Sequence, residues 1–176
     1  MDGSVSRKGF TLIDLLLSIA IIGILGMLVV PQYHSYITDA KLDEAAGELV
    51  SGLQYSESLA VTHQRPFGLQ ADVDGNWFKV FDNRYKADPT PHHDADPPVD
   101  ANGVVLNPVE KKWFIKDFDL EQAFEGVSIT AVPAGGEILF YPDGHSSSSN
   151  GTITLQYGGS ERIITINGAT GRVHVQ

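Results

Sequence analysis

Two histidines and three carboxylates stand close together near the middle of the chain, and residues of these types can hold a metal ion. They are His92, His93, Asp94, Asp96 and Asp100. Imidazole nitrogen and carboxylate oxygen bind zinc, and carboxylate oxygen also binds calcium. Adjacent histidines seldom face one ion, however, and the glycine and terminal glutamate of a calcium loop are missing. The prolines and aspartates around them favour an irregular, exposed loop over residues 82–110, without a metal or other cofactor.

A second candidate is His145, which precedes a run of serines and could activate a hydroxyl group as a nucleophile. The serines belong to a low-complexity stretch, residues 144–151, and no separate acid is marked to orient the histidine. A turn between strands is therefore the better interpretation. We predict that the chain is not an enzyme. A membrane-anchored hydrolase or metal enzyme that uses the loop at residues 92–100 is the alternative of a different class.

A phosphate-binding site would need clustered cations, and the C-terminal segment offers only Arg172. The chain has 12 Lys and Arg residues against 22 Asp and Glu, a formal net charge of -10. Such an acidic protein repels nucleic-acid phosphates, so protein or metal partners are expected instead. The absence of cysteine excludes disulfides and thiolate metal sites.

The N-terminal residues join a short basic stretch to a long apolar one. Arg7, Lys8 and Gly9 precede the 21 residues 10–30, in which Asp14 is the only charged residue. A helix of that length spans about 31 Å, close to the ~30 Å hydrocarbon core of a bilayer. A carboxylate inside a membrane needs a partner. The basic flank predicts a single-pass segment with its N-terminus in the cytoplasm.

Beyond the apolar run, the pattern predicts a longer helix followed by strands. Pro31 marks either the exit of the chain from the membrane or a kink in the helix. Apolar residues then recur at threes and fours, which indicates an amphipathic continuation over residues 31–64. Arg65 and Pro66 end the helix. Alternating runs and turn pairs then predict six to eight antiparallel strands, and hence an α+β fold with the helix covering one face of a sheet. The expected strands are residues 67–73, 76–81, 112–115, 127–131, 137–141, 152–157, 162–166 and 171–175.

One string carries a specific family resemblance, namely Arg-Lys-Gly-Phe-Thr-Leu-Ile-Asp at residues 7–14. It resembles the leader and first mature residues of type IV pilins and type II secretion pseudopilins. The resemblance implies that prepilin peptidase removes residues 1–9 by cutting between Gly9 and Phe10, and that Phe10 is then N-methylated. Asp14 stands where the family usually has glutamate, a carboxylate that pairs with the N-terminal amine of a neighbouring subunit. Pro31 matches a proline at which pilin helices soften.

The C-terminal half resembles the GspH/FimT branch of this family. The resemblance lies in residues 139–144, the serine-rich loop after them, the Thr-Ile-Thr-Leu strand and the closing residues 171–173. It implies a minor pseudopilin, a structural subunit of the type II secretion pseudopilus that acts in protein secretion across the outer membrane. The alternative is a FimT/FimU-like minor pilin for type IV pilus assembly or DNA uptake. DNA-uptake members carry paired arginines, whereas this chain has Arg172 and His174.

The resemblance also implies partners and a location. The partners are major and minor pseudopilins in a filament, the prepilin peptidase, inner-membrane lipid and the secretion platform, with nucleic acid not expected. The location is the bacterial inner membrane, with residues 10–30 as a transmembrane helix and residues 66–176 as a periplasmic β-rich domain. After assembly the subunit would belong to the pseudopilus.

Overall fold

The computed structural model describes residues 11–176, apart from the side chains of residues 28–35. The chain divides into two units, Met1–Ile37 and Thr38–Gln176. Helix α1, Leu12–His63, contributes residues to both. It ends where the sequence predicts, because Gln64 takes a left-handed conformation (φ 51°) and Pro66 cannot continue a helix.

The described part of the first unit is the apolar portion of α1. Its large apolar side chains are exposed, with exposed fractions between 50% at Ile21 and 82% at Met27. Across the part of the chain that the structure describes, no helix combines the length and the apolar character that a membrane crossing requires. The leader at residues 1–9 and the cleavage site lie outside the described residues. The predicted span at residues 10–30 and the kink at Pro31 involve residues whose placement or side chains are not described, and both stay predictions.

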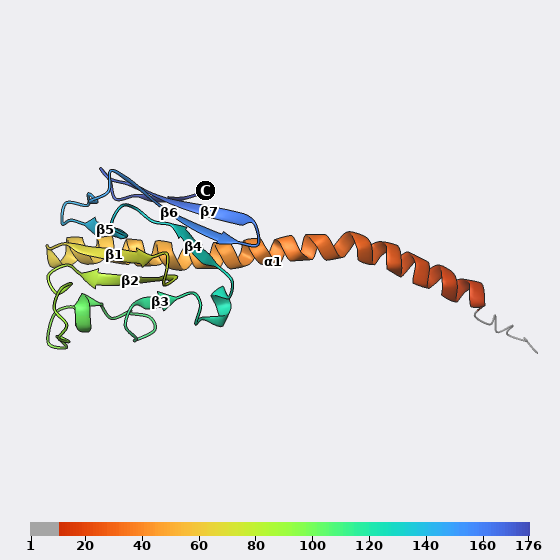
Figure 1. The fold of residues 1–176 in the computed structure, drawn as a ribbon, viewed down its shortest axis with the longest axis horizontal. Coiled ribbons are helices and arrows are strands. Elements are labelled where there is room, and N and C mark those ends of the chain that lie inside the picture. The colour runs from red at the N-terminus through yellow and green to blue at the C-terminus, as the bar shows by residue number, and fades with distance from the viewer. Residues whose placement is uncertain (1–10) are drawn as a thin grey trace, which may run out of the picture. The chain divides into compact units, whose positions relative to one another are not determined.

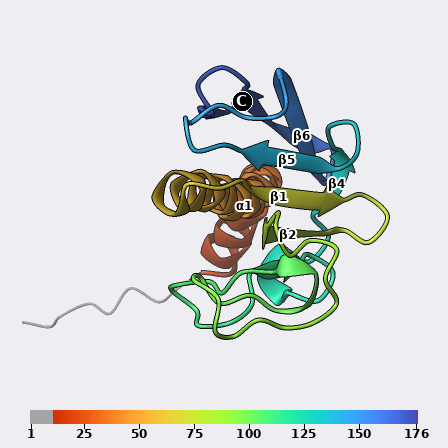
Figure 2. The same cartoon turned by 90° about the vertical axis from the view of Figure 1, so that its left-hand side faces the viewer.

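The second unit contains two four-stranded antiparallel sheets rather than the single sheet that the sequence suggested. The first sheet has the order β3 (Ile115–Asp117), β2 (Trp77–Asp82), β1 (Phe67–Asp72), β5 (Glu137–Phe140). The second has the order β4 (Ser128–Ala131), β6 (Asn150–Tyr157), β7 (Ser160–Asn167), β8 (Val173–Val175). The strands of this unit are grouped around the C-terminal half of α1 (Figures 1 and 2). The α+β prediction is confirmed.

The hairpin between β6 and β7 forms at the predicted glycine pair. Gly158 and Gly159 both have positive φ, 58° and 91°, and connect Tyr157 directly to its partner Ser160. Positive φ at both central residues matches the twist of the flanking strands, and glycine adopts it without strain.

The strand predicted at residues 112–115 is displaced. β3 begins only at Ile115, and Trp113 forms an isolated bridge with Leu106. The reason is a turn, in which the Asn107 N–H donates to the Lys112 carbonyl at 2.7 Å. That bond uses Lys112 to close the turn, so the ladder with β2 starts later.

The core forms where the amphipathic face of α1 meets both sheets. Leu42, Leu49 and Leu53 are fully buried against residues of both sheets, such as Leu69 and Ile164. Burying a leucine side chain contributes about 1.5–3 kcal/mol, so this face holds the helix on the sheets. The predicted stripe is thus confirmed in the second unit.

The proline-rich segment, residues 82–110, folds against β2, on the side of the domain away from β6 and β7 (Figure 1). It contains one short 3₁₀ helix, η1 (Ala101–Gly103), and isolated bridges. Val99 and Val105 are fully buried, and the Val105 N–H donates to the Val80 carbonyl at 3.0 Å. The expectation of an exposed loop is therefore wrong for these valines, which anchor the segment to the core.

Candidate functional site

The charged residue of the apolar segment, Asp14, lies in the first turn of α1 and bonds to Thr11. The Thr11 backbone N–H and hydroxyl both donate to Asp14 Oδ2, at 3.0 and 2.7 Å, and the Asp14 N–H donates back to Thr11 Oγ1 at 3.4 Å. This reciprocal pattern is a capping box, and a carboxylate there also interacts favourably with the helix dipole. The sequence assigned no role to Thr11, although a threonine three residues before an acid, ahead of an apolar run, is the signal for such a cap.

The carboxylate of Asp14 keeps one oxygen available. Both bonds from Thr11 end on Oδ2, and within the described residues no donor reaches Oδ1. Gly9 and Phe10, the predicted cleavage and methylation residues, lie outside the described residues. The structure therefore shows one part of the predicted assembly motif, with a carboxylate oxygen free to accept a further donor.

The histidines of the proline-rich segment go to different partners. His92 stacks on Tyr85 with ring centroids 4.4 Å apart, and its Nε2 lies 2.8 Å from Asp88 Oδ2. His93 stacks on Trp113 instead, at 5.6 Å. The hydrogen bond with His92 is the largest cause of a lowered pKa for Asp88. The two imidazoles are therefore not directed at one ion.

The carboxylates proposed as metal ligands do not complete a set. Asp96 Oδ2 lies 3.9 Å from Nδ1 of His63 on α1, and the Asp94 side chain is exposed. Among residues 11–176, no three histidine, aspartate or glutamate side chains are gathered closely enough to hold a metal ion.

The second histidine candidate does have an acid beside it. Asp143 Oδ1 contacts His145 Nδ1, and the His145 ring stacks on Tyr141 at 4.4 Å. The serines bond elsewhere: Ser146 donates to the Ser148 carbonyl at 3.1 Å, and Ser147 Oγ accepts the Leu139 N–H at 2.9 Å. This is an ordered turn rather than a nucleophile activated by a base.

The C-terminal arginine lies in the closing turn. Arg172 is exposed, its carbonyl accepts the Asn167 N–H at 2.8 Å, and His174 pairs with Thr165 in β8. A single exposed guanidinium on an acidic domain gives little attraction for phosphate.

A buried lysine surrounded by acids lies where α1 meets the first sheet. Lys116 on β3 is 5% exposed, and its Nζ donates to Glu110 at 2.6 Å and lies 3.4 Å from Glu48 and 3.6 Å from Glu121. Burial by itself would lower the pKa of Lys116, but the bond to Glu110 and the three negative charges outweigh it, and the pKa is raised. Spacing along the chain does not indicate this cluster, because its members come from four separate places in the sequence.

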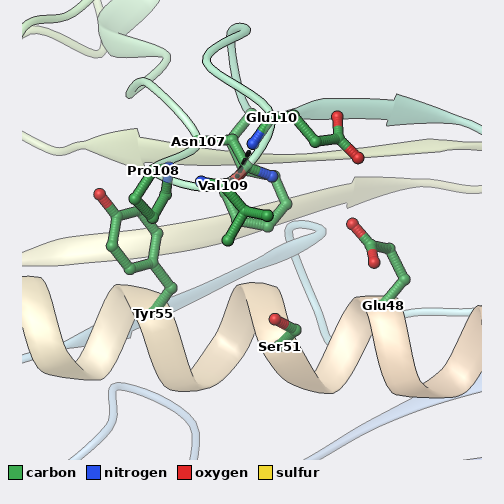
Figure 3. Close-up of a pocket in the computed structure, with 8 residues that line it drawn as sticks. Glu48, Ser51, Tyr55, Asn107, Pro108, Val109 and Glu110 are labelled. Atoms are coloured by element: carbon green, nitrogen blue, oxygen red, sulfur yellow. Dashed lines mark hydrogen bonds between the residues drawn. The ribbon is translucent and has the colours of Figure 1, made fainter.

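Beside this cluster lies a pocket of about 180 Å³ between α1 and the turn at residues 107–110. Figure 3 shows Glu48, Ser51 and Tyr55 on the helix facing Asn107, Pro108, Val109 and Glu110 on the turn. The Tyr55 hydroxyl donates to the Leu106 carbonyl at 3.3 Å and ties the two walls together. Val109 at the edge of the pocket is 86% exposed, an apolar side chain without cover in the described chain.

A long N-terminal helix packed on antiparallel sheets, with a capped acid in its first turn, defines a pilin-like subunit. The model of the family described as "Type II transport protein GspH" matches residues 45–170, and the chain belongs to that family. Its members are structural, non-enzymatic proteins.

Two solved structures share the fold. The minor pseudopilin EpsH from the type 2 secretion system of Vibrio cholerae has a TM-score of 0.51 at 15% identity, over 77% of this chain and 96% of that one. The type IV minor pilin FimU of Pseudomonas aeruginosa has a TM-score of 0.50 at 20% identity, over 78% of this chain and 90% of that one. At these identities the likeness shows the fold alone.

Some curated relatives share a higher identity with this chain, but over a shorter stretch of it. The type IV major alpha-pilin of Moraxella bovis is 47% identical over 47 residues, 27% of this chain and 30% of the relative. A fimbrial protein of Moraxella nonliquefaciens is 38% identical over 80 residues, 46% and 51% of the two chains. This chain therefore covers about half or less of the length of these relatives. Together the family match and these relatives identify a protein of the type IV pilin and type II pseudopilin class.

Proposed function

We propose that the protein is a minor pseudopilin of the type II secretion system, a structural subunit of the pseudopilus that acts in protein secretion across the outer membrane. The observation that carries this proposal is the match to the GspH family over residues 45–170. The fold of EpsH supports it. The periplasmic domain would present its surfaces to neighbouring pseudopilins, and the energy for assembly would come from another protein, since the sequence has no phosphate-binding loop.

In this proposal the N-terminus is processed and then drives assembly. Prepilin peptidase cuts after Gly9 and frees the amine of Phe10, which is N-methylated. Residues 10–30 anchor the subunit in the inner membrane. Asp14 then accepts the amine of a neighbouring subunit, and its free Oδ1 supports such a contact without loss of the cap from Thr11.

The cleavage step is tested by replacing Gly9 with leucine. We expect the unprocessed precursor to accumulate in the membrane, measured by intact mass and by immunoblot of membrane fractions. Gly3→Leu in the same leader is the matched control and should leave processing unchanged. A mature protein of normal mass from the Gly9 variant would refute the assigned cleavage site.

The assembly role is tested at Asp14. Asp14→Ala should be processed normally but should copurify poorly with other filament subunits, whereas Asp14→Glu should be tolerated or improve copurification. Thr11→Val removes the capping hydroxyl and keeps the charge, so it separates the two functions of the carboxylate. If Asp14→Ala copurifies as well as the native chain, the carboxylate has no role in assembly.

The second candidate function is a FimT/FimU-like minor pilin that primes type IV pilus assembly or aids DNA uptake. The fold of FimU and the fimbrial relatives favour it. Deleting the gene distinguishes the two. Loss of secreted protein from the medium with intact pili supports the pseudopilin, and loss of pili with intact secretion supports the pilin.

A further inference from the structure

The turn at residues 107–112 carries two lysines that have no ionic partner. Within the described residues, the side chains of Lys111, Lys112 and Arg172 make no hydrogen bond or ion pair. The remaining cations there are occupied: Arg65 and Arg84 with Asp82, Lys86 with Glu137, Lys116 with its three acids, Arg162 with Asp39 and Asp43, Lys41 with the Glu125 carbonyl, and Lys79 over the ring of Trp77. These two lysines are thus adjacent unpaired cations in a chain of net charge -10.

The acid next to these lysines in sequence is already used. Glu110 accepts the Lys116 ammonium at 2.6 Å, and Figure 3 shows its side chain at the same end of the pocket as that of Glu48. The charge of Glu110 is thereby committed to the buried cluster. The positive charge of Lys111 and Lys112 remains available to another molecule.

The backbone holds the two lysines in a defined and strained turn. Asn107 Oδ1 accepts the Val109 and Glu110 N–H groups at 2.9 and 3.3 Å, and the Asn107 carbonyl accepts the Lys111 N–H at 3.0 Å. Lys111 has φ 58°, a left-handed conformation that glycine adopts freely and lysine adopts only at a cost. A lysine kept in that conformation supports a function for its side chain.

Next to the turn is a hollow of about 580 Å³, here called the lysine–tryptophan hollow, lined by Leu106, Lys111, Lys112, Trp113 and Ile115. The indole of Trp113 is supported by its stack with His93, and Ile115 is 48% exposed. Three apolar residues and two lysines thus line one space. A partner that fits must offer both carboxylates and apolar side chains.

We propose that the lysine–tryptophan hollow binds an acidic, extended segment of a neighbouring protein, in which carboxylates alternate with aliphatic residues. The carboxylates pair with Lys111 and Lys112, and the aliphatic side chains cover Trp113 and Ile115. Charge complementarity favours a peptide segment over nucleic acid or an anionic membrane, because those large polyanions meet the negative field of the whole domain. Binding here does not depend on which of the two filament systems the protein joins.

The test uses the full chain in a zwitterionic detergent and a short synthetic peptide of alternating glutamate and leucine. The chain has two tryptophans, so Trp77→Phe leaves Trp113 as the sole indole reporter. We expect a saturable change in Trp113 fluorescence that weakens as salt is added. Fluorescence anisotropy of the labelled peptide with the native chain measures the same binding without the substitution.

The variant Lys111→Gln/Lys112→Gln should weaken peptide binding about tenfold. Both side chains are exposed, so its melting temperature should match that of the native chain. Arg172→Gln removes the third unpaired cation and should leave the affinity unchanged, and a lysine–leucine peptide should not bind. The proposal would be overturned if the double variant bound the acidic peptide as tightly as the native chain, or if binding were not saturable. Tighter binding of single-stranded DNA or phosphatidylglycerol vesicles than of the acidic peptide would also overturn it.

Discussion

The carboxylate of Asp82 is the point at which the end of α1, the end of β2 and the start of the proline-rich segment meet, and removing it should destabilise the domain strongly. Asp82 is fully buried. Its Oδ2 accepts two donors of the Arg65 guanidinium, at 3.0 and 2.9 Å, and its Oδ1 accepts the Arg84 N–H at 3.0 Å. Arg65 also donates to the Asp96 carbonyl at 2.5 Å, so this arginine connects the start of the proline-rich segment, at Asp82, to its middle, at Asp96.

The magnitude follows from these contacts. Each hydrogen bond to a charged group contributes about 1.5–3 kcal/mol, but the three bonds share one carboxylate and are not additive. Removing one partner of a buried pair costs about 3–5 kcal/mol, because the other charge is left uncompensated. We therefore expect Asp82→Ala to lower the free energy of unfolding by about 3–5 kcal/mol, a large part of a typical total of 5–15 kcal/mol. Asp82→Asn keeps an acceptor and should lose about 1–3 kcal/mol.

The assay is urea unfolding of the full chain in detergent, followed by tryptophan fluorescence. Asp94→Ala is the matched control, since Asp94 is an exposed acid of the same segment and should change stability by no more than about 0.5 kcal/mol. If Asp82→Ala loses less than about 1 kcal/mol, the buried pair does not anchor the segment and the reasoning is wrong.

Three further predictions concern packing and pH. A β-carbon on Gly52 would lie 3.1 Å from two core side chains, so Gly52→Val should cost about 1–3 kcal/mol more in thermal unfolding than Gly47→Val, where nothing lies within 4 Å. The pKa of Lys116 in the folded protein is raised above 10.5, so the stabilisation from its charge is complete below pH 10.5 and is lost as the pH rises through the pKa of the folded state. The free energy of unfolding, measured from about pH 9 to about pH 12, should show this loss in the native chain and not in Lys116→Met. The pKa of Asp88 in the folded protein is lowered from 3.8, mainly by the hydrogen bond with His92, so the stabilisation from its charge is present above pH 3.8 and is lost as the pH falls through the pKa of the folded state. In Asp88→Asn, the free energy of unfolding should therefore fall less steeply as the pH is lowered.

Features that depend on neighbouring residues could be predicted from the sequence. The end of α1 near His63 and the hairpin at Gly158 and Gly159 follow from proline, glycine and periodicity, because each is decided within a few residues. The buried face of the helix follows from the same local pattern.

The division into two sheets could not be predicted in the same way. Leu69 in β1 pairs with Ile138 in β5, and Phe140 meets the loop at Ser146, so the sheets are defined by contacts between distant segments. Alternation of apolar and polar residues shows that a strand has two faces, but it does not show which strand lies beside it.

The same limit applies to the proline-rich segment. Its composition suggested a metal site or a solvated loop. The histidines and acids behind that suggestion do make specific contacts in the structure. The composition could not show that His92 faces Tyr85 and Asp88, or that His93 faces Trp113, a residue that follows the segment in the chain. Stacking partners of this kind are set by tertiary packing, which sequence spacing does not encode.

The N-terminal carboxylate shows how the resemblance and the structure complement each other. The family pattern assigns Asp14 to a partner in another subunit, whereas the structure gives it a partner three residues away, Thr11, in its own chain. The two are compatible, because the capping bonds occupy Oδ2 alone. Glutamate is also a usual third residue of a capping box. We therefore expect Asp14→Glu to keep the cap from Thr11 and to extend the reach of the carboxylate by one methylene group.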